Sequence, residues 1–419
     1  MMNTIKKKLA EINLLYYQNG TIDIEYLNSL SDEMLSQNHL DLFCWCMYLI
    51  CNYYLQKSEY DDFKMFYDKL KNIADEKEGY PLIFYLIIDC IYKSVDASKF
   101  QDSIESIEKS MDLYNNLGID DQLTLFRIKH LLGVTYTVSG DNVKAYERFS
   151  EALQCKLHKT SVFLKASTYN WLGALEVRNN NSKAGLFNYL KAEEILKKYS
   201  ILSTSYTNVL NQIGYQYLLL KKFEEGFKVL TQASDLAENT DNNTVKIRTQ
   251  EYLGLYYIET GEYKKAEEVL LNVLKTSNVN EIAVFGFTNQ NLGILYTKMN
   301  QFDKAYKYFL DSLDIMTKSN NSLTVFSLCC SITRMFLIQN NLVKAKEYIN
   351  KAEARLSDLN SLKSKIEIYE LYFMYFEAKK QYKKALQYSK QLIEMIKDRN
   401  ESIRMTDIEF SEIIRQVNR

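Results

Sequence analysis

Proline is almost missing from this chain: Pro81 is the only one among 419 residues. β-Sandwiches and barrels use proline in turns and at strand edges, whereas proline disrupts the interior of an α-helix. A long chain that avoids proline therefore favours an all-α fold. Histidine is also scarce, with three residues, so a classical catalytic triad has few candidates.

Excess charge and long apolar runs are missing as well. The 52 basic and 53 acidic residues give a net charge of -1, which offers no bulk attraction for nucleic acid or an anionic membrane. No run approaches the roughly 20 apolar residues that span a bilayer. Seven scattered cysteines and no signal-peptide pattern indicate free thiols in a reducing compartment. We therefore expect a cytoplasmic protein with no membrane partner and no direct nucleic-acid partner.

One group of residues comes close to a zinc motif: His39, Cys44, Cys46 and Cys51. Cys44 and Cys51 are seven residues apart, which places them on one face of a helix among apolar neighbours, and the chain has no second cysteine pair with the Cys-x2–4-Cys spacing of zinc sites. We predict that these cysteines are core residues. The chain also has no Gly-rich phosphate loop, nucleophile elbow or HExxH motif, so we predict no catalytic residue, no metal and no cofactor.

An internal repeat with a period near 40 residues is the strongest pattern that is present. Five glycines mark it: Gly133, Gly173, Gly214, Gly254 and Gly293. Twelve residues after each comes a small residue: Ala145, Gly185, Gly226, Ala266 and Ala305. Four residues later comes a bulky one: Phe149, Tyr189, Leu230, Leu270 and Phe309. A fixed period of this length is typical of a solenoid.

The spacing predicts a helical hairpin in each repeat. Glycine costs about 1 kcal/mol against alanine inside a helix, so we predict that each glycine lies where two antiparallel helices approach closely. An aromatic three residues further on is expected to fill the gap beside the glycine; these aromatics are Tyr136, Tyr217, Tyr257 and Tyr296. In the turns between the helices, Gly261 and Asn300 are expected to adopt positive φ.

The whole chain is therefore predicted to be all-α, a right-handed superhelical solenoid of helical hairpins preceded by a helical N-terminal region. We place the N-terminal region at residues 1–75, the repeat array at 76–397 and a C-terminal capping helix at 398–419. Within the N-terminal region, helices are expected at Ile5–Tyr17, Ile24–Leu35 and Leu42–Leu55.

The repeat resembles the tetratricopeptide repeat in the identity and spacing of its signature residues. The copy that shows it is Leu132, Gly133, Tyr136, Gly140, Ala145, Phe149 and Ala152. The period near 40 is longer than the family's 34, which predicts longer helices or a longer connection. The resemblance implies that the first helix of each hairpin lines an inner groove, with residues three and six before the glycine facing into it.

Those groove positions are rich in side chains that can hold a peptide. Asn and Gln offer both a donor and an acceptor to a peptide backbone, and Arg captures carboxylates. We therefore predict a peptide-binding site made by these positions and their polar neighbours: Arg127, His130, Asn170, Asn208, Asn211, Gln212, Arg248, Glu251, Gln290 and Asn291. The alternative is that these polar residues simply face solvent.

A second resemblance is to the Rap branch of the RRNPP quorum-sensing peptide receptors. It is carried by the segment Asn289–Phe309, in which Asn291 falls where that family places a backbone-gripping Asn, and by the three expected N-terminal helices. It implies an intracellular receptor for a short signalling peptide that controls contacts of the N-terminal region with a response regulator or transcription factor.

Two other functions stay open. One is a constitutive scaffold for protein–protein interaction. The other is a response-regulator phosphatase, for which the family uses a glutamine just before an Asp-Leu-Leu run; here Leu40 precedes Asp41 and the nearest glutamine is Gln37. A homodimer is also left open.

Overall fold

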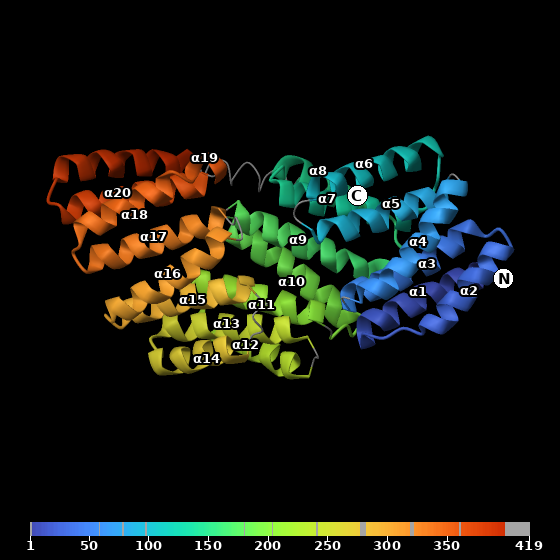
Figure 1. Ribbon diagram of the computed structural model, residues 1–419, viewed down its shortest axis with the longest axis horizontal. Coiled ribbons are helices and arrows are strands. Elements are labelled where there is room, and N and C mark those ends of the chain that lie inside the picture. Colours follow the sequence, from blue (N-terminus) through green and yellow to red (C-terminus); the bar gives the residue numbers. More distant parts are fainter. Residues whose placement is uncertain are drawn as a thin grey trace. The chain divides into compact units, whose positions relative to one another are not determined.

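The computed structural model describes residues 2–57, 59–77, 79–96, 99–179, 181–202, 204–239, 242–276, 282–318, 322–359 and 362–398. These residues form helices and no β-strand, which confirms the all-α prediction (Figure 1). They divide into two compact units. Unit 1 is Met1–Val177 with Gly185–Tyr206, and unit 2 is Arg178–Ala184 with Thr207–Arg419.

Unit 1 contains the N-terminal helices and the first hairpins. Its helices are α1 (Met2–Asn19), α2 (Ile24–Ser36), α3 (Leu40–Lys57), α4 (Tyr60–Glu76), α5 (Tyr80–Ser94), α6 (Phe100–Asn116), α7 (Gln122–Ser139), α8 (Asn142–Gln154), the 3-10 helix η2 (Lys159–Leu164), α9 (Lys165–Arg178) and α10 (Ser182–Lys198). The first three of these confirm the three helices expected in the N-terminal region.

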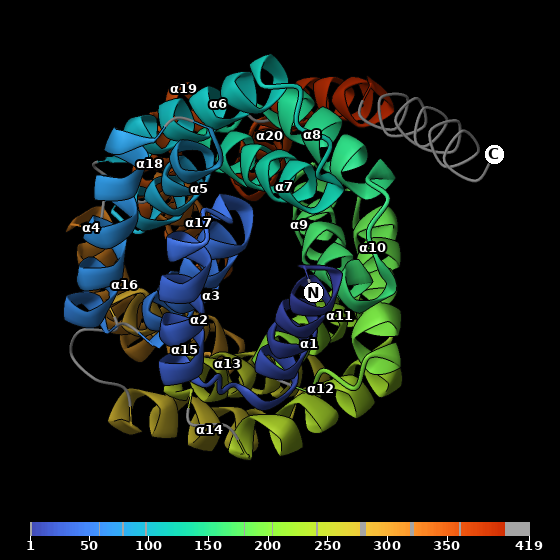
Figure 2. The ribbon, with the colours of Figure 1, turned by 90° about the vertical axis from the view of Figure 1, so that its right-hand side faces the viewer.

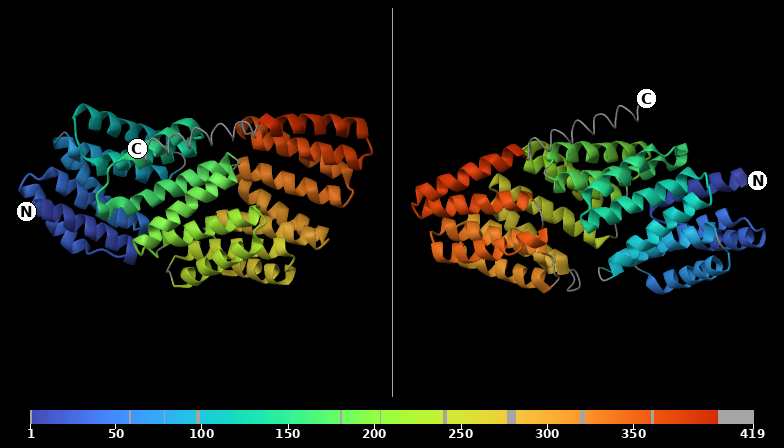
Figure 3. Two further views of the ribbon diagram at one scale, coloured as in Figure 1. Left: turned by 180° about the vertical axis from the view of Figure 1, so that it is seen from behind. Right: turned by 90° about the horizontal axis from the view of Figure 1, so that it is seen from above.

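Unit 2 continues the same pattern. Its helices are α11 (Thr204–Leu219), α12 (Phe223–Glu238), α13 (Asn243–Thr260), α14 (Tyr263–Thr276), α15 (Ile282–Lys298), α16 (Phe302–Lys318), α17 (Ser322–Ile338), α18 (Leu342–Glu353), α19 (Leu356–Leu359) and α20 (Leu362–Ala378), and residues 382–398 are also helical. Within unit 2, successive hairpins stack side by side (Figure 3), with α11, α13 and α15 on the inner side and α12, α14 and α16 on the outer side (Figure 2).

One hydrophobic core connects the N-terminal helices with the first hairpins of unit 1. It includes Leu9, Leu42, Phe63, Ile87 and Leu132, which come from five different helices. Cys44, Cys46 and Cys51 also lie in this core, each with 0% of its surface exposed, which confirms that they are core residues. The domain boundaries at residues 75 and 397 stay predictions, and residues 399–419 lie outside the described part of the chain.

The repeated glycines lie at the contact between the two helices of each hairpin, as predicted. A Cβ atom built on Gly254 would lie 2.6 Å from Leu270 Cδ2, and one built on Gly293 would lie 2.5 Å from Phe309. The other three glycines meet the bulky residue sixteen positions later in the same way. Each glycine therefore makes room for a bulky side chain of the partner helix.

The aromatic residue that follows the glycine has a different role from the one predicted. The gap beside Gly293 is filled by Phe309 of the second helix and not by Tyr296. The Tyr296 hydroxyl instead donates a 2.6 Å hydrogen bond to Glu267 Oε1 of α14, the second helix of the preceding hairpin. The prediction was wrong for Gly293, because three residues turn the side chain about 60° away from the glycine around the helix axis. In an earlier copy, Tyr217 does lie beside a small residue, with its Cβ 3.4 Å from a Cβ built on Gly226.

Turns between helices end in residues with left-handed backbone conformation. Gly261 has φ 82° and Asn300 has φ 58°, which confirms both predictions. Several helices begin with a side-chain cap: Asp121 accepts from the backbone N–H groups of Leu123 and Thr124 at the start of α7, and Asn242 accepts from Val245 at the start of α13. These local signals fix where each hairpin turns.

Candidate functional site

A series of side-chain hydrogen bonds joins the first helices of successive hairpins; we call it the hydroxyl ladder. In unit 1, His130 Nδ1 and Thr168 Oγ1 are 3.0 Å apart. In unit 2, Asn211 Nδ2 donates to Thr249 Oγ1 at 2.8 Å, Thr288 Oγ1 donates to Glu251 Oε1 at 2.8 Å, and Gln290 Nε2 donates to Ser327 Oγ at 3.1 Å. Each bond spans 37 or 38 residues of sequence, so the ladder follows the repeat.

Four predicted groove residues therefore fasten one hairpin to the next. Asn211 is only 1% exposed and Glu251 only 5% exposed. The expectation that residues three before the glycine face into an open groove is wrong for these two. The physical reason is the helical rotation of 100° per residue, which turns this position toward the first helix of the next hairpin.

His130 is held neutral by its surroundings. Its Nε2 lies 3.3 Å from Ser167 Oγ, and its ring stacks on Phe126 with 5.9 Å between centroids. Burial lowers the pKa of His130 from 6.5 to about 4. At neutral pH the ring is therefore an uncharged member of the ladder and not a cationic anchor.

Glu251 is the acidic member of the ladder. Burial raises the pKa of Glu251 from 4.5 to about 7, although the Arg248 Nε atom 3.7 Å away and the hydrogen bond from Thr288 act in the opposite direction. The carboxyl group consequently changes charge near neutral pH.

Four predicted groove residues of unit 2 that do not belong to the ladder lie two or six positions before a glycine. We call this set the amide face; it consists of Asn208, Gln212, Arg248 and Asn291 with the aromatic residues Tyr215, Tyr252 and Phe287. Positions two and six before the glycine are four residues apart, so they share one face of each helix. The face is thus built by α11, α13 and α15, which lie on the inner side of unit 2 (Figure 2).

Contacts between helices hold the amide face together. The rings of Tyr215 and Tyr252 have centroids 5.3 Å apart, and the Arg248 guanidinium carbon lies 5.9 Å from the Phe287 ring centroid. The Tyr252 hydroxyl also interacts with the side chains of Gln212 and Arg248. Asn208 is exposed, the Arg248 side chain is 40% exposed, and Gln212 and Asn291 are half-buried, so their polar groups can reach a ligand.

The predicted site residues of unit 1 are placed differently. Arg127 is 5% exposed and lies against the aromatic rings of Tyr48 and Trp45, so it does not face an open groove as the resemblance implied. Asn170 is half-buried, and its Oδ1 atom is shielded from solvent without a hydrogen-bond partner.

Gln37 lies at the C-terminal end of α2, outside α3. It is exposed and donates a 3.1 Å hydrogen bond to Glu33 Oε1 on its own helix. The structure gives it no partner that would orient its amide toward another chain.

Sequence reasoning missed two groups of residues. One is the hydroxyls of the ladder, Thr168, Thr249 and Thr288, although each stands five residues before its glycine and the repeat therefore carried the signal. The other is the aromatic part of the amide face, Tyr215, Tyr252 and Phe287, because the sequence analysis considered only the polar residues at the groove positions.

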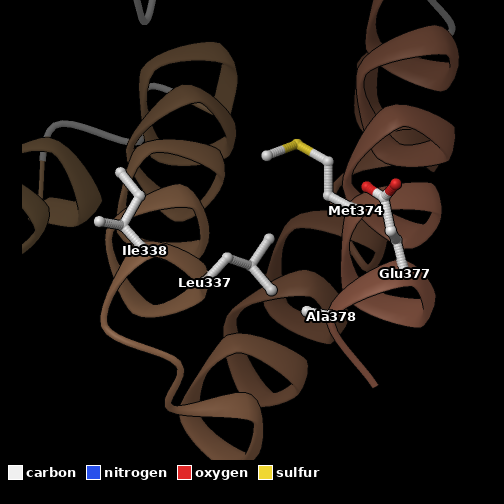
Figure 4. A pocket seen from close by; sticks show the side chains of 5 residues that line it. All are labelled: Leu337, Ile338, Met374, Glu377 and Ala378. Atoms are coloured by element: carbon white, nitrogen blue, oxygen red, sulfur yellow. The ribbon is translucent and has the colours of Figure 1, made fainter. Parts of the chain in front are cut away.

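An open hollow lies at the C-terminal ends of α17 and α20 (Figure 4). It has a volume of about 260 Å³ and is lined by Leu337, Ile338, Met374, Glu377 and Ala378. None of the predicted site residues lines it.

The described residues contain no group of three or more His, Cys, Asp or Glu side chains arranged to hold a metal ion. Across the same part of the chain, none of the helices has the length and apolar character needed to cross a membrane.

We expect the ladder to stabilise the stack of hairpins measurably. Asn211→Ala should lower the free energy of unfolding by about 1–3 kcal/mol, because it leaves the buried Thr249 hydroxyl without its donor. Thr249→Val should cost about 1 kcal/mol, and the double variant should show a coupling of about 0.5–1.5 kcal/mol in urea denaturation. Asn208→Ala, on the same helix but exposed, is the control and should stay within about 0.5 kcal/mol of wild type. Equal effects of the two Asn→Ala changes would contradict the ladder.

Comparison with known families identifies the repeat. Residues 290–322 match the tetratricopeptide repeat model. The chain is 22% identical over 232 residues to the mitochondrial tetratricopeptide repeat protein 19 homolog of Drosophila melanogaster, covering 51% of this chain and 60% of that protein. It is 23% identical over 280 residues to response regulator aspartate phosphatase I of Bacillus subtilis, covering 64% of this chain and 71% of that protein.

Solved structures extend the similarity to the fold. A Rap protein complexed with competence and sporulation factor matches with a TM-score of 0.61 and 13% identity, covering 85% of this chain and 98% of that one. NprR in complex with its cognate peptide NprX matches with a TM-score of 0.56 and 18% identity, covering 81% and 98%. The chain therefore carries a match to the tetratricopeptide repeat at residues 290–322, and its fold is similar to that of the Rap and NprR proteins.

Proposed function

We propose that this protein is a regulator that binds a short, extended peptide across the amide face of unit 2. The observation that carries the proposal is that three successive inner helices each present accessible Asn, Gln or Arg side chains next to an aromatic ring. Such side chains can hold a peptide backbone through paired donors and acceptors, while the rings cover its side chains.

The spacing of the helices suits an extended chain. Packed helices lie about 8–10 Å apart, and an extended peptide rises about 3.3 Å per residue. Every third residue of a peptide running across α11, α13 and α15 would therefore meet a new pair of amide-face side chains. A peptide of about six to eight residues would engage all three helices.

The comparisons support the same proposal. NprR, whose fold is similar, is described in complex with a cognate peptide. Its 18% identity to this chain supports the fold, and the amide face provides the separate chemical argument. We further propose that the bound peptide controls contacts of α1, α2 and α3 with a protein partner.

Substitutions on the amide face should weaken peptide binding and leave stability unchanged. A hexapeptide selected from a synthetic library on the wild-type protein is titrated calorimetrically into each variant. Asn208→Ala and Gln212→Ala should each lose about 1–3 kcal/mol, which is fivefold to more than a hundredfold in affinity. Arg248→Ala should show a loss that shrinks with added salt if the peptide presents a carboxylate there.

Asn272→Ala is the matched control, because Asn272 is an exposed asparagine on α14 at the outer side. It should bind like wild type. Folded amide-face variants that also bind like wild type would place the peptide elsewhere on the protein and refute the proposal.

A further inference from the structure

Arg127 is a charged side chain in unit 1 that is nearly buried and has no partner of opposite charge among the residues that the structure describes. It lies on α7 and keeps only 5% of its surface exposed. Among the described residues no carboxylate lies within ion-pair distance of it, and its Nη2 atom is shielded from solvent without a hydrogen-bond acceptor. Buried charges in proteins are normally paired. The described residues therefore supply no acceptor for Arg127 Nη2 and no charge that neutralises the guanidinium.

Its immediate neighbours are aromatic and come from α3. The Arg127 Cζ atom lies 4.1 Å from the ring centroid of Tyr48 and 5.6 Å from that of Trp45. These rings stabilise the cation through their faces, but they accept no in-plane hydrogen bond from its N–H groups. The rings contact the guanidinium and leave its Nη2 atom without an acceptor among the described residues.

A second donor without an acceptor stands beside it. Trp45 Nε1 is also shielded from solvent and has no hydrogen-bond partner in the described part of the chain. Since an indole N–H can only donate and a guanidinium can only donate, the two side chains cannot satisfy each other. His130, one turn further along α7, is neutral and already bonded to Thr168, so it adds neither a negative charge nor a free acceptor.

We propose that Arg127 and Trp45 form a binding site for a carboxylate group carried by a ligand of this protein. A carboxylate is planar and has two oxygens, so one oxygen can accept from the guanidinium and the other from the indole N–H. Water would satisfy the hydrogen bonds but would leave the charge unpaired. A phosphate needs more donors around its tetrahedral oxygens than these two flat groups provide.

This proposal does not depend on peptide binding at the amide face, which belongs to unit 2. Acetate is the smallest probe of it. The chain has two tryptophans, so Trp171→Phe leaves Trp45 as the only indole and makes its fluorescence a direct reporter. Sodium acetate is titrated against sodium chloride at constant ionic strength and pH 7.5.

We expect a saturable change in Trp45 emission that is specific to acetate. Arg127→Gln in the same background should weaken the apparent affinity at least tenfold, because the charged donor is removed. Lys109→Gln, which removes an exposed positive charge from unit 1, should leave the titration unchanged. N-Acetylglycine and acetyl-aspartyl amide, titrated in the same way, distinguish a chain-terminal carboxylate from a side-chain carboxylate as the natural source.

A second measurement does not rely on indole fluorescence. Acetate should raise the melting temperature of the wild-type protein, and Trp45→Phe, which removes the N–H and keeps an aromatic ring, should reduce that shift by at least half. The proposal is overturned if wild type gives no acetate-specific response, if folded Arg127→Gln responds like wild type, or if inorganic phosphate acts at lower concentration than acetate. If Arg127→Gln does not fold, as judged by circular dichroism, the Trp45→Phe comparison decides.

Discussion

Replacing Gly254 by leucine is expected to lower the free energy of unfolding by about 3 kcal/mol. A Cβ atom at this position would lie 2.6 Å from Leu270 Cδ2 and 2.8 Å from Leu270 Cγ, both of which are completely buried. Overpacking of this kind typically costs about 1–3 kcal/mol, occasionally more. It outweighs the roughly 1 kcal/mol of helix propensity that glycine sacrifices. Urea denaturation followed by circular dichroism measures the change.

Gly254→Ala separates these two effects. It gains the same helix propensity but adds only the Cβ, so we expect a smaller loss of about 1–2 kcal/mol. Glu268→Leu, at an exposed position of α14, is the control for adding a leucine and should change stability by less than about 0.5 kcal/mol. A Gly254→Leu protein as stable as wild type would mean that the two helices are not in close contact at this glycine.

The second large effect concerns Glu251 and pH. Burial raises the pKa of Glu251 in the folded protein from 4.5 to about 7. At pH values between 4.5 and about 7, the Glu251 carboxyl group keeps its proton in the folded protein, whereas in the unfolded chain it has released it. The free energy of unfolding contributed by Glu251 is therefore complete below about pH 4.5 and is lost as pH rises through about 7.

Glu251→Gln removes this pH dependence and keeps an acceptor for the Thr288 hydroxyl. The variant should gain stability relative to wild type as pH rises from 4.5 to 8, by about 3 kcal/mol in total, since one pKa unit corresponds to about 1.4 kcal/mol. Urea denaturation of both proteins at several pH values gives the difference. Subtracting the unfolding free energy of wild type from that of the variant cancels the contributions of other titrating groups such as His130.

Glu268→Gln, an exposed carboxyl in unit 2, is the control and should show little difference from wild type across the same range. If the stability difference between Glu251→Gln and wild type were independent of pH, Glu251 would not be a buried carboxyl with a raised pKa. In that case the hydrogen bond between Thr288 of α15 and Glu251 of α13 would need to be reconsidered.

Much of the fold could be predicted from the sequence because its signals are local and repeated. The repeated glycines predicted where two helices touch, and the structure then showed that Gly254 meets Leu270, sixteen residues later. Gly261 and Asn300 predicted the turns, because the left-handed conformation there favours these residue types. The cysteines of α3 were predicted as core residues from one helical face.

The candidate site was predicted less well. The sequence showed which helix face is polar, but it did not show which of the polar repeat positions contacts a neighbouring helix. Asn211 and Gln212 are adjacent and chemically similar, yet one is buried in the ladder and the other is accessible. The 100° between neighbouring residues is enough to move a side chain from the ligand side to the hairpin interface.

The sequence by itself determined the helical hairpins, their period and the close contacts at the glycines, because these depend on residues within one hairpin. Only the tertiary structure decided which polar side chains remain free and that Arg127 lies against Tyr48 and Trp45, about 80 residues away. Those outcomes depend on how the side chains of one helix fit between helices from other parts of the chain. That fit is set by packing in three dimensions, and no repeat spacing encodes it.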